Sequence, residues 1–416
     1  MRTLLAASLL ALQAIAFEQA VKDIDSPDAG TRLRVAQMFK AAAYREAAVP
    51  LTKLILDSKD DIQLEAIAAE LNIFLADKVV PRSRVAFVIE KRAAVAAAAA
   101  FGAGPEALGA QTVPPEVLAA LRTAFRDETP RVAVEAIYAF GALASAANGR
   151  RDLLRASGSE LVAVLGSPDP AVRYAGLSVI GRVYQRSAGD GPVETTIGDA
   201  VVNAMNDSDR ALALAAIHAA GALRYERAVQ GLTDLFQFYR TGEMAEASLD
   251  AIARIAHPAS ATLLEAQLAA KNPTLRGIAA EGIARLGDPA RMPRVNGALG
   301  SERDAGVVLA RAFAAASLAN DPIDPIVDAL KKPRVRDQAR SYLIELAPRR
   351  ASAYARALTD ENAQVREIAV DALGLSGDPS ALPLVESMAS DRDPRVARAA
   401  ERAVARLMRR GTAPPE

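Results

Sequence analysis

One apolar position recurs along this chain at intervals close to 31 residues, and this periodicity constrains the fold more than any other feature. Most successive copies are 28 to 40 residues apart; the exception is a wider gap between residues 64 and 132. A unit of that length holds two short helices but cannot bury its own apolar surface, so neighbouring units must stack into one continuous core. We call the recurring position the anchor. The anchors are Leu33, Leu64, Val132, Val172, Leu212, Met244, Leu275, Val307, Val335, Val365 and Val396.

Other positions keep step with the anchor. Alanine is common four residues after it, and leucine, isoleucine or valine predominates eleven residues after it. Offsets of 0, 4 and 11 fall on one stripe of an α-helix. Turn sequences such as Gly287-Asp288-Pro289 and Gly377-Asp378-Pro379 then end that helix before a second apolar helix begins. The chain is therefore predicted to be all-α, a right-handed α-solenoid of stacked helical hairpins.

The polar residues around the anchor have a recurring form, seen best at 167–173 (SPDPAVR) and 360–366 (DENAQVR). Asp stands three to five residues before the anchor and Arg directly after it. We interpret the Asp residues as helix caps and the Arg residues as partners of carboxylates in their own or the next repeat. The pattern resembles the short, phycobilin-lyase-like class of bacterial HEAT repeats over about residues 28–410. The resemblance implies the fold and leaves the activity open, because scaffolds and a few enzymes share this repeat.

Composition narrows the function. Lys+Arg and Asp+Glu balance at 50 each and tryptophan is absent, which argues against nucleic-acid binding. The absence of cysteine excludes disulfides, thiolate nucleophiles and cysteine-held metals. Neither His218 nor His257 is followed by the acidic residue with which HEAT-type deoxyhypusine hydroxylases hold iron, and the sequence contains no phosphate loop or nucleophile elbow. We predict no catalytic, metal-binding or cofactor-binding residues.

These exclusions favour a non-catalytic scaffold or adaptor whose partner is a protein or peptide bound on the curved surface and loop edge. The alternative is an enzyme on the same solenoid, either phycobilin-lyase-like or modifying another small molecule. The sequence leaves the oligomeric state open.

The first sixteen residues have the form of a secretory signal peptide. Arg2 precedes an apolar run from residue 4 to 12, and Ala14-Ile15-Ala16 is an A-x-A cleavage site. The run is too short to span a bilayer. The prediction is a signal peptide over 1–16, a solenoid over 17–410, a short tail over 411–416, and a periplasmic or secreted bacterial protein. The alternative is that residues 3–16 form the first buried helix of a cytoplasmic protein.

Two irregularities interrupt the periodicity. The stretch near 91–115, with its alanine run and Gly102-Ala103-Gly104-Pro105, is interpreted as a degenerate repeat, with a hinge as the alternative. Two consecutive units of 40 residues carry extra residues after their first helices. Insertions on one edge of a solenoid often mark a binding face, so we expect a raised lip that receives an acidic segment of a partner; the alternative is loop drift. The lip residues are Asn148, Arg150, Arg151, Arg186 and Asp190.

The last predicted helix carries arginines at steps of three to four residues, which is typical of one basic stripe. We interpret it as the polar cap of the terminal repeat, with docking of an acidic partner as the alternative. The stripe residues are Arg398, Arg402, Arg406 and Arg409.

Overall fold

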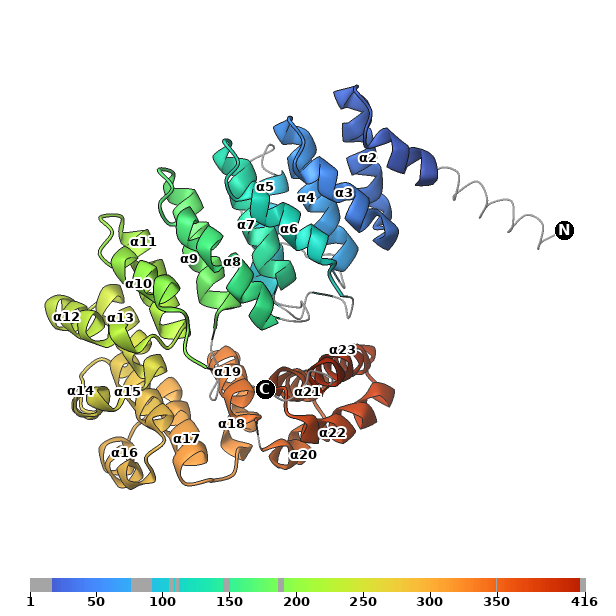
Figure 1. Cartoon of the computed structure of the whole chain (residues 1–416). Helices are drawn as coiled ribbons and strands as arrows, with labels where there is room; N and C mark the ends of the chain where they lie inside the picture. The colour runs from blue at the N-terminus through green and yellow to red at the C-terminus, as the bar shows by residue number, and fades with distance from the viewer. Residues whose placement is uncertain are drawn as a thin grey trace. The chain divides into compact units, whose positions relative to one another are not determined.

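The computed structural model describes residues 17–75, 92–104, 108, 112–144, 150–185, 191–348 and 350–411. About 77 % of the described residues are helical, and they contain no strand beyond one isolated bridge between Leu75 and Leu108. The helices pair as hairpins stacked in chain order (Figure 1). The predicted all-α solenoid is confirmed. Contacts divide it into two units, Met1–Val183 and Tyr184–Glu416, and each is described by itself.

Unit 1 begins with a short helix at residues 17–23. Its first helices are α2 (Ala29–Ala42), α4 (Asp60–Phe74), α7 (Pro130–Ala144) and α9 (Pro170–Val183). Its second helices are α3 (Ala48–Ile55), α6 (Pro115–Ala124) and α8 (Arg150–Val164), and a further helix, α5, spans Arg92–Ala103.

Unit 2 continues the same alternation. Its first helices are α11 (Arg210–Ala222), α13 (Glu243–Ile255), α15 (Pro273–Leu286), α17 (Ala305–Leu318), α19 (Arg336–Leu346), α21 (Ala363–Ser376) and α23 (Pro394–Gly411). Its second helices are α10 (Thr195–Ala204), α12 (Val229–Tyr239), α14 (Ala261–Gln267), α16 (Met292–Leu299), α18 (Asp324–Ala329), α20 (Ala355–Leu358) and α22 (Leu382–Ser387). No described helix combines the length and the apolar character needed to cross a membrane.

The anchors mark the starts of the first helices, as predicted. Each of these helices begins at most four residues before its anchor, or one residue after it in α19. All anchors except Leu33 are at most 7 % exposed. The residue before the helix caps it: the side chains of Asp28, Asp209, Asn272 and Asp304 accept hydrogen bonds from first-turn N–H groups. The interpretation of the recurring Asp residues as caps is confirmed for Asp28, Asp209 and Asp304, whereas Asp391 pairs with Arg366 of the preceding repeat instead.

The recurring arginines tie each repeat to the next. Arg366 lies 2.8 Å from Asp391 in the following repeat, and both side chains are at most 8 % exposed. Its guanidinium also donates to the backbone oxygen of Asp360, at 2.8 Å. Arg32 pairs in the same way with Asp57, at 2.6 Å. Because each guanidinium fixes its own loop and the next repeat together, these pairs set the register of stacking.

This pairing corrects the first two anchors. Arg32 and Gln63 make the link to the next repeat, so the residues equivalent to the later anchors are Thr31 and Ile62, two positions before Leu33 and Leu64. Ile62 is 2 % exposed, whereas Leu33 is half-buried. Apolar residues on both sides of the true position made the register ambiguous in sequence.

The wide gap between residues 64 and 132 contains an inserted helix rather than a degenerate repeat. Helix α7 packs against α4 as consecutive first helices do elsewhere, and α6 packs against α3. Gln63 on α4 donates to Asp127, just before α7, at 2.8 Å, which is the ordinary link between neighbours. Helix α5 is therefore additional to the array, and it packs on α7 and α4.

Candidate binding face

Polar residues gather on one stripe of the first helices, six and ten residues after the anchor. Offsets of 6 and 10 lie within about 40° of each other around a helix, and they are displaced from the apolar stripe at 0, 4 and 11. We call these positions the polar stripe. Its residues are Tyr138, Ser178, Arg182, His218, Asp250, Arg254, Glu281, Arg285, Glu345, Asp371, Arg402 and Arg406. The recurring charges at these offsets are visible in the sequence, but they do not by themselves indicate a shared face.

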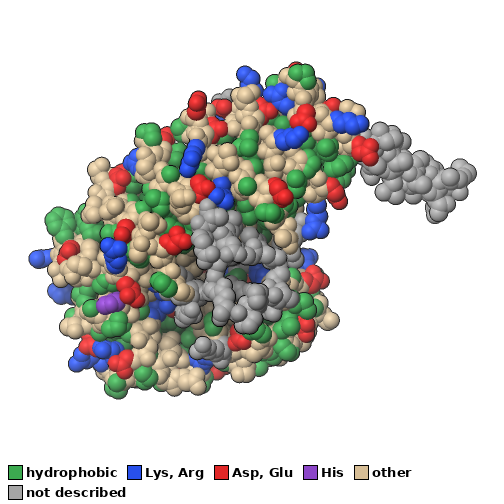
Figure 2. All heavy atoms as spheres, viewed as in Figure 1, with side chains coloured by type: hydrophobic (Ala, Val, Ile, Leu, Met, Phe, Trp, Pro, Cys, Tyr) green, Lys and Arg blue, Asp and Glu red, His purple; other side chains and the backbone are tan. Residues whose placement is uncertain are grey.

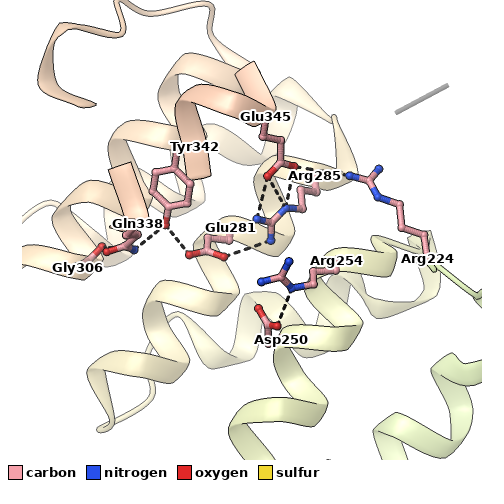
Figure 3. Close-up of polar contacts among 9 residues, drawn as sticks. All are labelled: Arg224, Asp250, Arg254, Glu281, Arg285, Gly306, Gln338, Tyr342 and Glu345. Atoms are coloured by element: carbon pink, nitrogen blue, oxygen red, sulfur yellow. Dashed lines mark hydrogen bonds and ion pairs between the residues drawn. The ribbon is translucent and has the colours of Figure 1, made fainter. Parts of the chain in front are cut away.

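In unit 2 three residues of the stripe, Glu281, Arg285 and Glu345, belong to one bonded network, shown in Figure 3. Arg285 on α15 holds the Glu345 carboxylate of α19 through two bonds, from Nε to Oε1 at 2.9 Å and from Nη2 to Oε2 at 3.0 Å. Its Nη1 also donates to Glu281, at 3.2 Å. Arg224, at the end of α11, lies 3.7 Å from Glu345. One carboxylate of α19 thus connects to helices two and four repeats earlier.

A buried tyrosine continues the network across α17. The Tyr342 hydroxyl donates to Glu281, and Gln338 donates both to that hydroxyl, at 2.7 Å, and to the backbone oxygen of Gly306, at 3.1 Å. The Tyr342 ring stacks on Phe313 with centroids 4.4 Å apart. The Tyr342 hydroxyl is therefore satisfied both as a donor and as an acceptor.

Charge states within this network are fixed by its pairing. Burial by itself lowers the pKa of Arg285, but the Glu345 and Glu281 carboxylates outweigh burial, so the pKa stands above its usual value. Burial and the neighbouring Glu281 raise the pKa of Tyr342 well above its usual value. A permanently charged guanidinium and a neutral phenol hold the helices together, and neither group is poised for proton transfer near neutral pH.

In unit 1 the corresponding stripe is covered by α5. Phe101 of α5 lies against Tyr138 on α7, with ring centroids 5.4 Å apart, and under the guanidinium of Arg182 on α9, whose carbon is 3.9 Å from the ring centroid. Gly141 on α7 makes the fit possible, because a Cβ there would stand 2.9 Å from the Phe101 ring. One aromatic side chain thus seats α5 against two first helices, α7 and α9.

The charges beneath α5 lack the partners that their counterparts have in unit 2. Arg182 makes no ion pair with any described residue, its Nη1 atom has no hydrogen bond, and burial lowers its pKa. Glu135 on α7 is 2 % exposed and accepts one bond, from the backbone N–H of Ala97, while its Oε1 atom is unpartnered. Burial, the largest influence, raises the pKa of Glu135 to about 8.

A second carboxyl in unit 1 is buried in the apolar core. Glu70 on α4 is fully buried, and neither of its oxygens has a hydrogen-bond partner. Burial raises its pKa well above the usual value, which keeps the group neutral. Other repeats place Phe140, Ile180 and Leu373 at this position of the first helix.

The predicted lip lies mostly outside the described residues. Asn148, Arg186 and Asp190 fall there. Arg150 and Arg151 belong to the first turn of α8 rather than to a loop, because the second helix of this long unit starts at Arg150. Partner binding at these residues stays a prediction.

The predicted basic stripe on α23 is not uniformly exposed. Arg398 is exposed, whereas the Arg402 side chain is 18 % exposed and lies 4.0 Å from Asp371 of α21. Arg406 is half-buried, and the side chain of Arg409 lies outside the described residues. Arg402 and Arg406 belong to the polar stripe, so two of the four residues face the array.

Other chemistry is sparse where the structure is described. The Nδ1 atom of His257 caps the turn after α13, and His218 is exposed. No group of three or more potential metal-ligating side chains occurs among the described residues.

A cavity of about 400 Å³ lies between α14 and α16, where Glu265 pairs with Arg291 and Arg294. On the surface shown in Figure 2, the described acidic and basic side chains are interspersed, with no patch of one sign.

Several solved structures are similar to this chain. The complex of CpcE and CpcF of phycocyanin lyase from a Nostoc species is 19 % identical with a TM-score of 0.40, over 60 % of this chain and 94 % of that chain. Importin-β is 13 % identical with a TM-score of 0.41, over 97 % of this chain and 59 % of that chain. Yeast importin-β is 16 % identical with a TM-score of 0.37, over 94 % of this chain and 50 % of that chain. This chain thus spans little more than half of the importins, and these likenesses indicate no activity or partner.

Sequence comparison identifies the repeat itself. No curated protein matches the chain. The family profile described as HEAT repeats matches residues 158–238 and 351–415, and it therefore covers repeats in both units. The chain therefore contains HEAT repeats over these residues, within a solenoid of stacked helical hairpins.

Proposed function

We propose that this protein is a non-catalytic scaffold that binds a segment of a partner protein on the polar stripe of its first helices. The proposal rests on the way helix α5 packs against the first helices of unit 1. A helix outside the repeat array is seated across α4 and α7 and touches α9 through Phe101, so this surface has the shape and chemistry to hold a chain segment. The bonded network of unit 2 also favours a structural role over acid–base chemistry at its centre.

The partner segment is proposed to be acidic. The stripe of unit 1 offers Arg182, a cation without an ion-pair partner among the described residues, and the lip predicted at Asn148 to Arg151 and Arg186 to Asp190 adds arginines. Arginine binds carboxylates through two parallel bonds, which gives direction as well as affinity.

Site-specific crosslinking tests the proposed function. A photo-reactive residue replaces Tyr174 of α9, which is 43 % exposed and lies one turn before Ser178 of the polar stripe, and a matched control replaces Val49, which is 45 % exposed on the second helix α3. After irradiation in cells that produce the protein, the Tyr174 position should give one dominant protein adduct by mass spectrometry, and the Val49 position should not. Equal adducts at both positions, or none at Tyr174, would contradict binding on the stripe.

Export is proposed together with this role. Phe17, directly after the predicted cleavage site, packs edge-to-face on Phe39 and Tyr44, with ring centroids 5.6 and 5.8 Å away. The residue that would begin the mature chain is therefore held in the fold by two aromatic contacts. N-terminal sequencing of exported protein should begin at Phe17, and an intact Met1 in a cytoplasmic pool would contradict the proposal.

A further inference from the structure

We infer that α5 is an intramolecular ligand in a helix-binding site formed by α4, α7 and α9, and that the external ligand of this site is an alanine-rich helix of a partner protein with a carboxylate at the place of Phe101. The inference rests on the proposed scaffold function and specifies its ligand.

The position and composition of α5 set it apart from the repeats. Consecutive repeats pack directly beneath it, α6 on α3 and α7 on α4, so the array does not require it. Residues 92–103 are alanine apart from Arg92, Val95, Phe101 and Gly102. Small side chains let the backbone of a helix approach a groove closely. Ala97, Ala100 and Phe101 are its buried residues among those whose side chains are described.

The chemistry of the site does not match α5. Among the described residues, the interaction of the Arg182 guanidinium is a cation–π contact with the Phe101 ring. A contact of this kind contributes about 1 kcal/mol. Arg285, at the same offset from its anchor, holds a carboxylate through two bonds in unit 2. A glutamate in the place of Phe101 could supply Arg182 with the same kind of partner, and its side chain is smaller than the ring it replaces.

Glu135 is a second group in the same site that lacks a hydrogen-bond partner for one of its atoms. It is 2 % exposed, yet one of its oxygens has no hydrogen-bond partner and the other accepts only from Ala97 of α5. A buried acceptor without a donor costs about 1–3 kcal/mol. The α5 helix therefore covers the site and leaves both a cation and a carboxyl incompletely bonded.

Covalent attachment explains how an imperfect ligand can stay in place. A tethered segment competes at an effective concentration on the order of millimolar. An external helix therefore has to bind more tightly than α5, and the pairing with Arg182 provides that margin.

A peptide-binding experiment tests the inference. The probe is a fluorescein-labelled synthetic peptide with the sequence of residues 92–104 and glutamate at position 101, and the matched control is the same peptide with the native phenylalanine. The protein is the full chain with Phe101→Ala, which weakens α5 without altering the site. Fluorescence anisotropy should show that the glutamate peptide binds about tenfold more tightly than the control peptide, equivalent to about 1.4 kcal/mol.

Arg182 is the second variable. Arg182→Gln, added to the Phe101→Ala chain, should abolish the preference for the glutamate peptide, and Arg182→Lys should keep part of it because the charge remains but the paired bonds do not. Arg34→Gln on α2, where the side chain is 70 % exposed, is the matched control and should leave the preference unchanged. Circular dichroism confirms folding of each variant. Equal affinities for the two peptides, or a preference that survives Arg182→Gln, would overturn the inference.

The crosslinking experiment separates this inference from the proposed function. If a partner crosslinks at Tyr174 but the peptides show no difference, the ligand is wrong and the scaffold function stands. If the glutamate peptide binds as expected but no partner crosslinks, the site is supported and the proposed cellular role is not.

Discussion

Arg182 in unit 1 and Arg285 in unit 2 occupy the same offset from their anchors but have opposite surroundings. The Arg285 side chain is 8 % exposed and bonded to two carboxylates. Arg182 lies over an aromatic ring and has no ion pair within the described structure. The repeat thus fixes the position of the polar stripe. The neighbouring elements determine whether the charged side chains of the stripe find ion-pair partners within the protein.

This difference suggests a division of labour. In unit 2 the stripe holds first helices of different repeats together, so a ligand there would have to break buried ion pairs. In unit 1 the stripe retains unmet bonding capacity, and the segment that covers it is not part of the array. A binding surface is more readily built on the second arrangement, because an incoming ligand can gain bonds that the free protein lacks.

The largest expected effect is the pH dependence of unit 1. The folded-state pKa of Glu135, about 8, lies above its ordinary value near 4.5, so the folded state binds the additional proton. Its contribution is complete below about pH 4.5, is lost as pH rises toward 8, and amounts to roughly 3 to 5 kcal/mol. The stability of unit 1, measured by urea unfolding with hydrogen exchange of α7 amides, should fall across this window.

Two variants isolate the contribution of Glu135. Glu135→Gln should flatten the fall, leaving the part due to Glu70, whose pKa is raised in the same direction. Glu160→Gln is the control in the same unit. The pKa of Glu160 is lowered, because its bonds to Arg122 and the backbone outweigh burial, so this variant should keep the fall between pH 5 and 8. Equal pH profiles for wild type and Glu135→Gln would contradict the assignment.

The next effect compares the two arginines directly. Arg285→Ala removes a side chain that is only 8 % exposed, leaving Glu281 without its cation and Glu345 with Arg224 alone, and it should cost about 3 kcal/mol. Arg182→Ala removes only a cation–π contact and should cost about 1 kcal/mol or less. Urea unfolding followed by circular dichroism measures both. Costs of equal size would show that the two stripes do not differ as described.

A smaller effect concerns the fit of α5. Gly141→Ala would place a Cβ 2.7 Å from Val179 and 2.9 Å from the Phe101 ring, and it should cost about 1–2 kcal/mol while loosening α5. Gly277→Ala in α15 is the matched control, since its Cβ would meet only Val307, at 4.0 Å. Hydrogen exchange in α5 should accelerate in the first variant and stay unchanged in the second. Unchanged α5 protection in Gly141→Ala would contradict the fit.

The fold could be predicted from sequence because the same pattern of residues recurs in each repeat. Anchors such as Val172 and Val365 combine burial, a cap and an arginine at fixed spacing, so an error in one copy is corrected by the others. The first two anchors were placed two residues late, because Leu33 and Leu64 fit the apolar pattern as well as Thr31 and Ile62. Only the link from Gln63 to Asp127 settles the register.

The binding face could not be predicted in the same way. An alanine run such as 96–100 fits a repeat helix and an inserted helix equally well, and nothing local says that α7 packs directly on α4. Whether Arg182 or Arg285 finds a carboxylate depends on residues from other repeats, such as Glu345, which is 60 positions from Arg285. The positions of the charged residues could be identified from the sequence, but their pairing partners could not.

The smallest expected effect tests whether α5 competes with an external ligand. A Cβ at Gly102 would meet no atom within 4 Å, so Gly102→Ala should stabilise α5 by about 0.5 kcal/mol through helix propensity alone. Because a more stable intramolecular ligand is harder to displace, the glutamate peptide should bind this chain about twofold more weakly than wild type. Gly297→Ala in α16 is the matched control, since its Cβ would also meet nothing within 4 Å and it lies outside unit 1. The control should gain similar stability and leave peptide affinity unchanged. If both variants bind the peptide as wild type does, α5 covers its site without competing for it.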